Sequence, residues 1–264
     1  MPLVVVDPGH GGTDPGATGN GLQEKDINLA AGLQLRDALQ RCGIQVIMTR
    51  TEDVLPLTGG TIAADLTYRA SLANQNRSDL FVSWHVNSYS DPSVSGVSVY
   101  IYPSTRGTTT ETVATAIVNA IAQATGQKNR GVYVEDFAVL RETSMTAVLV
   151  ESGFITNPQE AAQLASAAFR AEQAEAAAQA ICQFFDLPYV APAASPVSNP
   201  SPSTGETGEQ IPDFAQSAVN RVVQAGLLVG YPDGTFRPNQ PVTRAELAIV
   251  LTRFYDFLQS GRTL

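Results

Sequence analysis

The chain has 264 residues, of which 44% are hydrophobic, and a formal net charge of −9. This length suits one α/β domain of ordinary size plus a remnant too short for a second large core. Only two lysines occur, Lys25 and Lys128, so the acidic chain would repel a phosphate backbone and nucleic acid is not expected as a partner. No uninterrupted apolar stretch reaches the roughly 18 residues that span a bilayer, so no transmembrane segment is predicted.

Apolar, β-branched runs alternate with helical patterns along the first 187 residues. The runs are nearly continuous, which is typical of strands buried on both faces of a sheet. In chain order we predict strand Leu3–Val6, helix Glu24–Arg41, strand Ile44–Met48, helix Tyr68–Asn76, strands Leu80–Trp84 and Val97–Tyr102, helix Thr110–Thr125, strand Ala147–Val150 and helix Pro158–Phe185. This order predicts an α/β fold, a mostly parallel sheet with helices on both faces, followed by a small helical module.

The composition changes at Pro188. From there to about Gln210 the chain is rich in Pro, Ala, Ser, Thr and Gly, which cannot bury enough apolar area to order themselves. Beyond it, the patterns predict two short helices, Ala218–Leu228 and one from Thr243 to near Leu258. The predicted division is therefore a main domain at 1–187, a flexible linker at 188–210 and a module at 211–264.

The start of the chain and its cysteines say little about compartment. Met1-Pro2 runs directly into the first strand without a basic or apolar leader, so we expect any export signal to have been removed or to lie outside this chain. Cys42 and Cys182 are far apart in sequence, and we interpret them as two buried free thiols rather than a disulfide.

A glycine-rich turn, Asp7-Pro8-Gly9-His10-Gly11-Gly12, follows the first strand, where dinucleotide-binding folds carry their phosphate loop. The required G-x-G-x-x-G is broken by Asp14, and no Gly-Lys-Ser/Thr follows anywhere. A nucleotide site is therefore not predicted.

Four ionisable residues are expected to meet at one edge of the sheet. His10 and His85 each follow a predicted strand, and Glu151 ends the last one. In open α/β sheets this edge is where ligands bind. Glu24 begins the helix entered from the glycine-rich loop, whose glycines allow the positive φ angles that fold it back toward His10. Two imidazoles and a carboxylate suffice for a catalytic zinc ion with an open fourth position, whereas a lone histidine is more often a core or surface residue.

Six segments carry a family resemblance: His10–Ala17, Glu24–Asp26, Arg69–Asn74, Ser83–Asn87, Val139–Arg141 and Val148–Phe154. In order and spacing they resemble the zinc-dependent N-acetylmuramoyl-L-alanine amidases, and the likeness extends from Leu3 to Phe185. The resemblance implies hydrolysis of the amide bond between N-acetylmuramic acid and L-alanine, with bacterial peptidoglycan as partner. It also implies an extracytoplasmic location, in the periplasm or cell wall.

The resemblance also implies roles for the four converging residues. Zinc would be held by His10, Glu24 and His85, and Glu151 would be the catalytic carboxylate. We expect Glu151 to take a proton from water and return it to the leaving amine.

Four other residues lie in or near these motifs. Trp84 stands where the family usually has leucine or isoleucine, and Thr146 where a proline commonly precedes the last strand, which leaves the shape of the substrate groove open. Arg141 is interpreted as a surface ion-pair residue, and Asn87 as either a turn residue or a site residue.

The module resembles an S-layer homology repeat in Gly230–Asn239 and Thr243–Glu246. The resemblance is weaker at Ile211–Phe214 and beyond, where the usual tryptophan is missing. It implies binding to a secondary cell-wall polymer, and the alternative is a structural spacer.

Two other functions remain open from sequence. One is a wall-binding protein that does not cut, against which the full set of four site residues argues. The other is a zinc hydrolase that cuts within the peptide stem, because the choice of bond depends on the shape of the groove.

Overall fold

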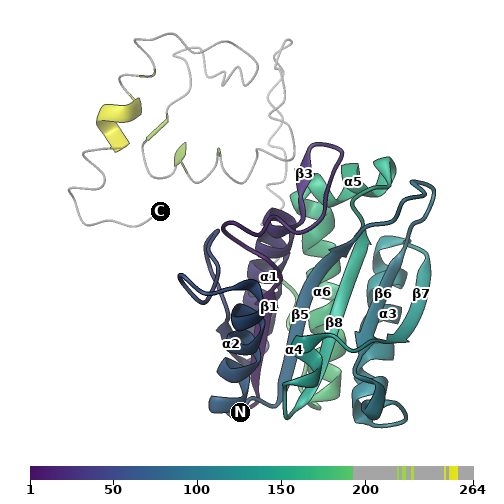
Figure 1. Cartoon of the computed structure of the whole chain (residues 1–264). Helices are drawn as coiled ribbons and strands as arrows, with labels where there is room; N and C mark the ends of the chain where they lie inside the picture. The colour runs from purple at the N-terminus through teal and green to yellow at the C-terminus, as the bar shows by residue number, and fades with distance from the viewer. Residues whose placement is uncertain (193–218, 220–221, 224–226, 229–246, 248–249, 255–264) are drawn as a thin grey trace, which may run out of the picture. The chain divides into compact units, whose positions relative to one another are not determined.

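The computed structural model describes residues 1–192, 219, 222–223, 227–228, 247 and 250–254 (Figure 1). The chain divides into two compact units, Met1–Ala194 and Ser195–Leu264. Residues 193–210 of the predicted linker, and most of the module, lie outside the described residues. Within the module, residues 219, 222–223, 247 and 250–254 are helical and fall inside the two predicted helices. Among the described helices, none has the length and apolar character needed to cross a membrane.

The larger unit is built on a six-stranded sheet in the order β4-β1-β5-β8-β6-β7. Neighbouring strands are parallel except β6 and β8, which confirms the prediction of a mostly parallel sheet. The strands are β1 Leu3–Pro8, β4 Gln45–Met48, β5 Leu80–Asn87, β6 Val97–Ile101, β7 Asn129–Val134 and β8 Thr146–Phe154. A small antiparallel pair, β2 Thr18–Gly19 and β3 Leu22–Gln23, precedes the first helix.

The helices are α1 Glu24–Arg41, α2 Ile62–Gln75, α3 Thr109–Thr125, α4 Ala138–Arg141, α5 Pro158–Ala165 and α6 Ala167–Phe184, with a 3-10 turn at Pro103–Thr105. The bounds of α1 agree with the prediction. Helix α2 begins ahead of the predicted Tyr68 because the Thr61 side chain caps it by accepting from the Ala64 backbone N–H. The single helix predicted at Pro158–Phe185 is two, since Ser166 is extended and caps α6.

One face of the sheet, here called the rear face, is covered by α1, α3 and α6 (Figure 1). Its side chains come from alternate strand residues, as the two-residue period of a strand requires. They form a single apolar core with the helices, including Val4, Val6, Leu80, Val82, Trp84, Val99, Val148, Val150, Leu35, Ile117 and Ile181. Cys42 and Cys182 lie in this core as buried free thiols, as predicted.

The opposite, front face carries α2 and α4 (Figure 1). Its core is smaller and includes Val5, Phe81 and Leu149. Farther along the same strands, the residues that point to the front face are polar. Parallel pairing sets Asp7 beside Ser83 and His85 beside Glu151, so the polar residues of three strands reach the front face together.

Candidate active site and metal centre

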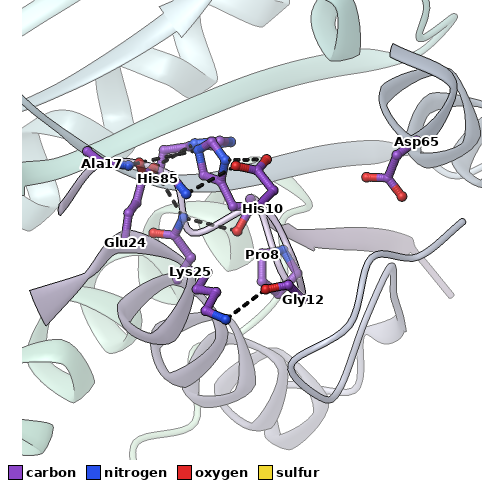
Figure 2. Close-up of polar contacts among 12 residues, drawn as sticks. Pro8, His10, Gly12, Ala17, Glu24, Lys25, Asp65 and His85 are labelled. Carbon is purple, nitrogen blue, oxygen red and sulfur yellow. Dashed lines mark hydrogen bonds and ion pairs between the residues drawn. The ribbon is translucent and has the colours of Figure 1, made fainter. Parts of the chain in front are cut away.

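His10, Glu24 and His85 converge above the carboxyl ends of β1 and β5 (Figure 2). His10 Nε2 lies 3.2 Å from Glu24 Oε2, and His85 Nδ1 lies 2.9 Å from Glu24 Oε1. One ligand atom from each residue falls within 4.8 Å of the others. The three residues come from a loop, a helix N-terminus and a strand, and they meet as the sequence predicts.

The Glu24 carboxylate is held in place by backbone and side-chain donors. The Ala17 backbone N–H donates to Oε2 at 2.8 Å, and Oε1 accepts from the Val86 backbone N–H at 3.1 Å and from Asn28 Nδ2 at 3.2 Å. Burial raises the pKa of Glu24, but hydrogen bonds from His10 and His85 outweigh it, so the net pKa lies well below its usual range. Glu24 is thus an ionised carboxylate in a fixed orientation.

His10 is oriented by Asp14, a contact that the sequence analysis missed. His10 Nδ1 lies 2.8 Å from Asp14 Oδ2, and Asp14 Oδ1 accepts from the Gly16 backbone N–H at 3.1 Å. His10 itself has φ 61°, a left-handed conformation that is costly for a residue with a Cβ. An acidic residue four positions after a histidine in a glycine-rich loop is the signal that could have identified this pair.

Two buried arginines hold the loop that carries His10. Arg69 donates to the backbone oxygens of Pro8 and His10, each at 2.9 Å, and Arg50 donates to that of Gly9 at 3.0 Å. Three consecutive carbonyls are therefore bound by guanidinium groups, which fixes the path of the loop.

Arg69 is neutralised by two carboxylates beneath the loop. Asp7 Oδ1 and Asp65 Oδ2 each lie 2.7 Å from it, and all three side chains are almost fully buried. Burial raises the pKa of Asp7, but the Arg69 charge and hydrogen bonds from Thr49, Arg69 and Ser83 bring it below its usual value. The site therefore rests on a buried ionic base.

Glu151 lies across from His85 on the paired strand β8. Its Oε2 atom is shut off from solvent and finds no hydrogen-bond partner among the described residues. Burial, and then the nearby Glu24 carboxylate, raises the pKa of Glu151 well above its usual value. A buried carboxyl oxygen that no described residue pairs, in a pocket shared with two histidines, indicates a place for water or substrate.

The four residues line one pocket of about 310 Å³. Ligand nitrogens and oxygens bound to zinc at 2.0–2.1 Å in a tetrahedron lie roughly 3.3 Å apart, so the cluster needs only a small adjustment to hold the ion. Two imidazoles and one carboxylate match the donor chemistry of a catalytic zinc site. The residues present fit the metal.

The remaining sequence interpretations are resolved by position. Arg141 is exposed and pairs with Asp136 and Glu142, which confirms it as an ion-pair residue. Asn87 is the last residue of β5 rather than a turn residue; its Oδ1 accepts from the Ser88 backbone N–H, and it lines the pocket. Trp84 is fully buried in the rear core, so its departure from the family pattern does not shape the groove.

The sequence matches the N-acetylmuramoyl-L-alanine amidase family over residues 4–183. The chain belongs to this family. It is 38% identical over 189 residues to the sporulation-specific N-acetylmuramoyl-L-alanine amidase of Bacillus subtilis (strain 168), an overlap of 71% of this chain and 69% of that protein. The predicted activity, hydrolysis of an amide bond in peptidoglycan, is thereby confirmed.

Solved amidase structures share the fold. N-acetylmuramoyl-L-alanine amidase AmiC2 of Nostoc punctiforme superposes with a TM-score of 0.63 at 36% identity, covering 70% of this chain and 97% of that one. The catalytic domain of CwlV, the amidase from Bacillus (Paenibacillus) polymyxa var. colistinus, gives 0.64 at 31% identity over 71% of this chain and all of that domain (100%). Residues 208–248 of the amidase match the S-layer homology domain.

Proposed function

We propose that the amidase binds zinc through His10, Glu24 and His85 and uses Glu151 for proton transfer when it hydrolyses the amide bond between N-acetylmuramic acid and L-alanine. One observation carries this proposal: three ligand atoms lie within 4.8 Å of one another, in the same pocket as Glu151, whose Oε2 atom is buried and has no partner among the described residues. When bound, zinc would supply a Lewis acid that polarises the scissile carbonyl and activates water.

The protein's own groups prepare this chemistry. Asp14 occupies His10 Nδ1, which leaves Nε2 to face the cluster. The backbone N–H groups of Ala17 and Val86 hold the Glu24 carboxylate in its orientation. Glu151, paired with His85 across the sheet, takes a proton from water when ionised and returns it to the leaving amine when protonated.

We also propose that residues 1–187 form the catalytic domain, residues 188–210 a linker and residues 211–264 a module that binds a secondary cell-wall polymer. The support is the match of residues 208–248 to the S-layer homology domain. The amidase and S-layer homology matches together imply a cell-wall or extracellular location. The module would keep the enzyme near its polymeric substrate by raising the local concentration.

Metal removal tests the zinc proposal. The full chain is treated with a chelator, dialysed, and assayed on purified peptidoglycan before and after one equivalent of zinc is restored. We expect activity to vanish and return, with mass spectrometry finding stems that begin with free L-alanine. Full activity without metal would contradict zinc dependence, and stems cut within the peptide would contradict the assigned bond.

Two variants localise the metal. His10→Ala should bind no zinc, because the cluster loses one of its three ligands, whereas Arg141→Ala, an exposed control on the same front side, should retain one zinc per chain. Metal content is measured by elemental analysis of the purified proteins. One tightly held zinc in the His10→Ala protein would rule out this site.

A further inference from the structure

Three aromatic side chains form a ledge on the front side of the sheet, outside the cluster of ionisable residues. Tyr100 of β6 stacks on Tyr133 of β7 with ring centroids 5.4 Å apart and planes inclined by 23°. Phe137 packs against Tyr100, also at 5.4 Å. We call these three residues the aromatic ledge. Helix α3 packs on β6 and β7 through the buried residues of the rear face, so the ledge lies on the other face.

The ledge begins where the catalytic pocket ends. Phe137 lines the pocket together with Glu151. Tyr100 pairs across the sheet with Leu149, which lines the same pocket. Tyr133, on the neighbouring strand β7, is 40% exposed. A ligand that leaves the pocket in this direction therefore meets aromatic rings.

The substrate is larger than the pocket. A cavity of about 310 Å³ stands at the small end of the range for ligand sites, roughly 300–1,000 Å³. Peptidoglycan continues from the cut amide in two chemically different directions, along the glycan strand and along the peptide stem. One of these must run over the rim of the pocket.

Charge and ring chemistry favour the glycan strand on the ledge. Residues 135–142 contain three acidic side chains, and their one arginine, Arg141, is paired with Asp136 and Glu142. A peptide stem carries free carboxylates, which this acidic stretch would repel. The sugars of an uncut strand are neutral, because each lactyl carboxyl is tied up in the amide. One face of a pyranose ring presents C–H groups that a tyrosine ring can cover, removing apolar surface from water.

We propose that Tyr100, Tyr133 and Phe137 form a subsite for a sugar ring of the glycan strand next to the muramic acid that is cut. The proposal rests on the proposed function in one respect, that hydrolysis takes place in the pocket of Glu151. The ledge then selects substrates by the length of their glycan, independently of the metal.

Substrates of different glycan length test the subsite. The full chain is assayed on muramoyl peptides that carry one or four sugars with the same peptide. In the wild-type protein, KM should be lower for the longer glycan. Loss of one stacking ring should raise the KM for the longer substrate about three- to tenfold. Tyr133→Ala should therefore reduce the difference in KM between the two substrates. Tyr133→Phe, which keeps the ring, should restore it.

Tyr68→Ala is the matched control, because Tyr68 has nearly the same exposure, 39%, but lies on α2. Tyr68→Ala should leave the difference in KM between the two substrates unchanged. An equal effect of Tyr133→Ala on the KM of both substrates would overturn the proposal.

A binding measurement separates this inference from the proposed function. A tetramer of N-acetylglucosamine, which has no amide to the stem and needs no metal, is titrated into the chelator-treated full chain by calorimetry. Tyr133→Ala should weaken its binding about three- to tenfold relative to wild type and to Tyr68→Ala. Unchanged binding would refute the ledge even if zinc and Glu151 act as proposed. A weakened affinity would support it even if they do not.

Discussion

The two faces of the sheet are made by the same strands and do different work. On the rear face, Val82 and Trp84 of β5 enter an apolar core under three helices. One residue along, Ser83 and His85 reach the front face, where Ser83 donates to buried Asp7 at 2.8 Å and His85 meets Glu24. A one-residue step along a strand thus separates side chains of the apolar rear core from side chains of the polar site, because successive side chains point to opposite faces.

The comparison teaches that the front face is stabilised in a different way from the rear. The rear depends on close packing, where each small loss of volume has a modest cost. The front depends on ion pairs and hydrogen bonds among a few buried groups, where loss of one partner leaves the other buried and unpaired. Isosteric substitutions of front-face polar residues should therefore cause large losses of stability or activity. Small truncations of rear-face apolar residues should cause small losses of stability.

The largest effect is expected at Glu151→Gln. The amide keeps the size of the side chain but cannot accept the proton of water, so turnover should fall about 10²–10⁴-fold. Zinc content and thermal midpoint should stay close to wild type, as measured by elemental analysis and calorimetry. Turnover near the wild-type rate, with one zinc bound, would remove Glu151 from the mechanism.

A smaller but still large effect is expected at Asp7→Asn, which is also isosteric. The change removes one carboxylate from buried Arg69, which keeps Asp65, and breaking such a pair costs about 3–5 kcal/mol. The free energy of unfolding is measured by urea titration at neutral pH. A loss within error of zero would show that Asp65 alone satisfies Arg69.

The same variant has a defined pH signature. Folded Asp7 has a pKa below the unfolded value of about 3.9, so its ionised form stabilises the protein above roughly pH 4. This contribution is lost as the pH falls through the folded pKa. The difference in unfolding free energy between wild type and Asp7→Asn should be constant from about pH 5 to neutrality and shrink below about pH 4. A difference that grew on acidification would contradict the assignment.

The smallest effect is expected at Ile117→Val on the rear face. Ile117 is fully buried on α3, and removal of one methylene costs about 0.5–1.5 kcal/mol. Turnover and zinc content should not change, since Ile117 packs in the rear core and does not line the pocket. A loss of activity without loss of stability would show that the two faces are coupled.

Much of this arrangement could be predicted from sequence because it follows from local patterns. Helix α1 has an amphipathic pattern whose bounds coincide with the structure, and the strand-end rule brought His10, His85 and Glu151 to one edge. Glu24 could be added because the glycines before it permit a sharp return of the chain. These are properties of neighbouring residues and of strand direction.

The rest depends on contacts between distant segments. Buried Arg69 is paired with Asp7, which lies 62 positions away. No local sequence pattern predicts that these two residues pair. Strand β7 was not predicted because its sequence, Asn129–Val134, contains a glycine and polar residues and remains partly exposed at the sheet edge. The reversal of β6 relative to β8 likewise has no signature within either strand.

The fluorescence of Trp84 can report on the rear core separately from the front-face site. It is the only tryptophan in the chain, it is fully buried on the rear face, and its indole N–H has no hydrogen-bond partner among the described residues. An indole in such surroundings emits at short wavelength, and the emission moves to the red when water reaches it. The Trp84 ring points to the opposite face from His85, its neighbour in sequence. Its emission should therefore shift when the core unfolds and change little when only the pocket residues are altered or the metal is removed.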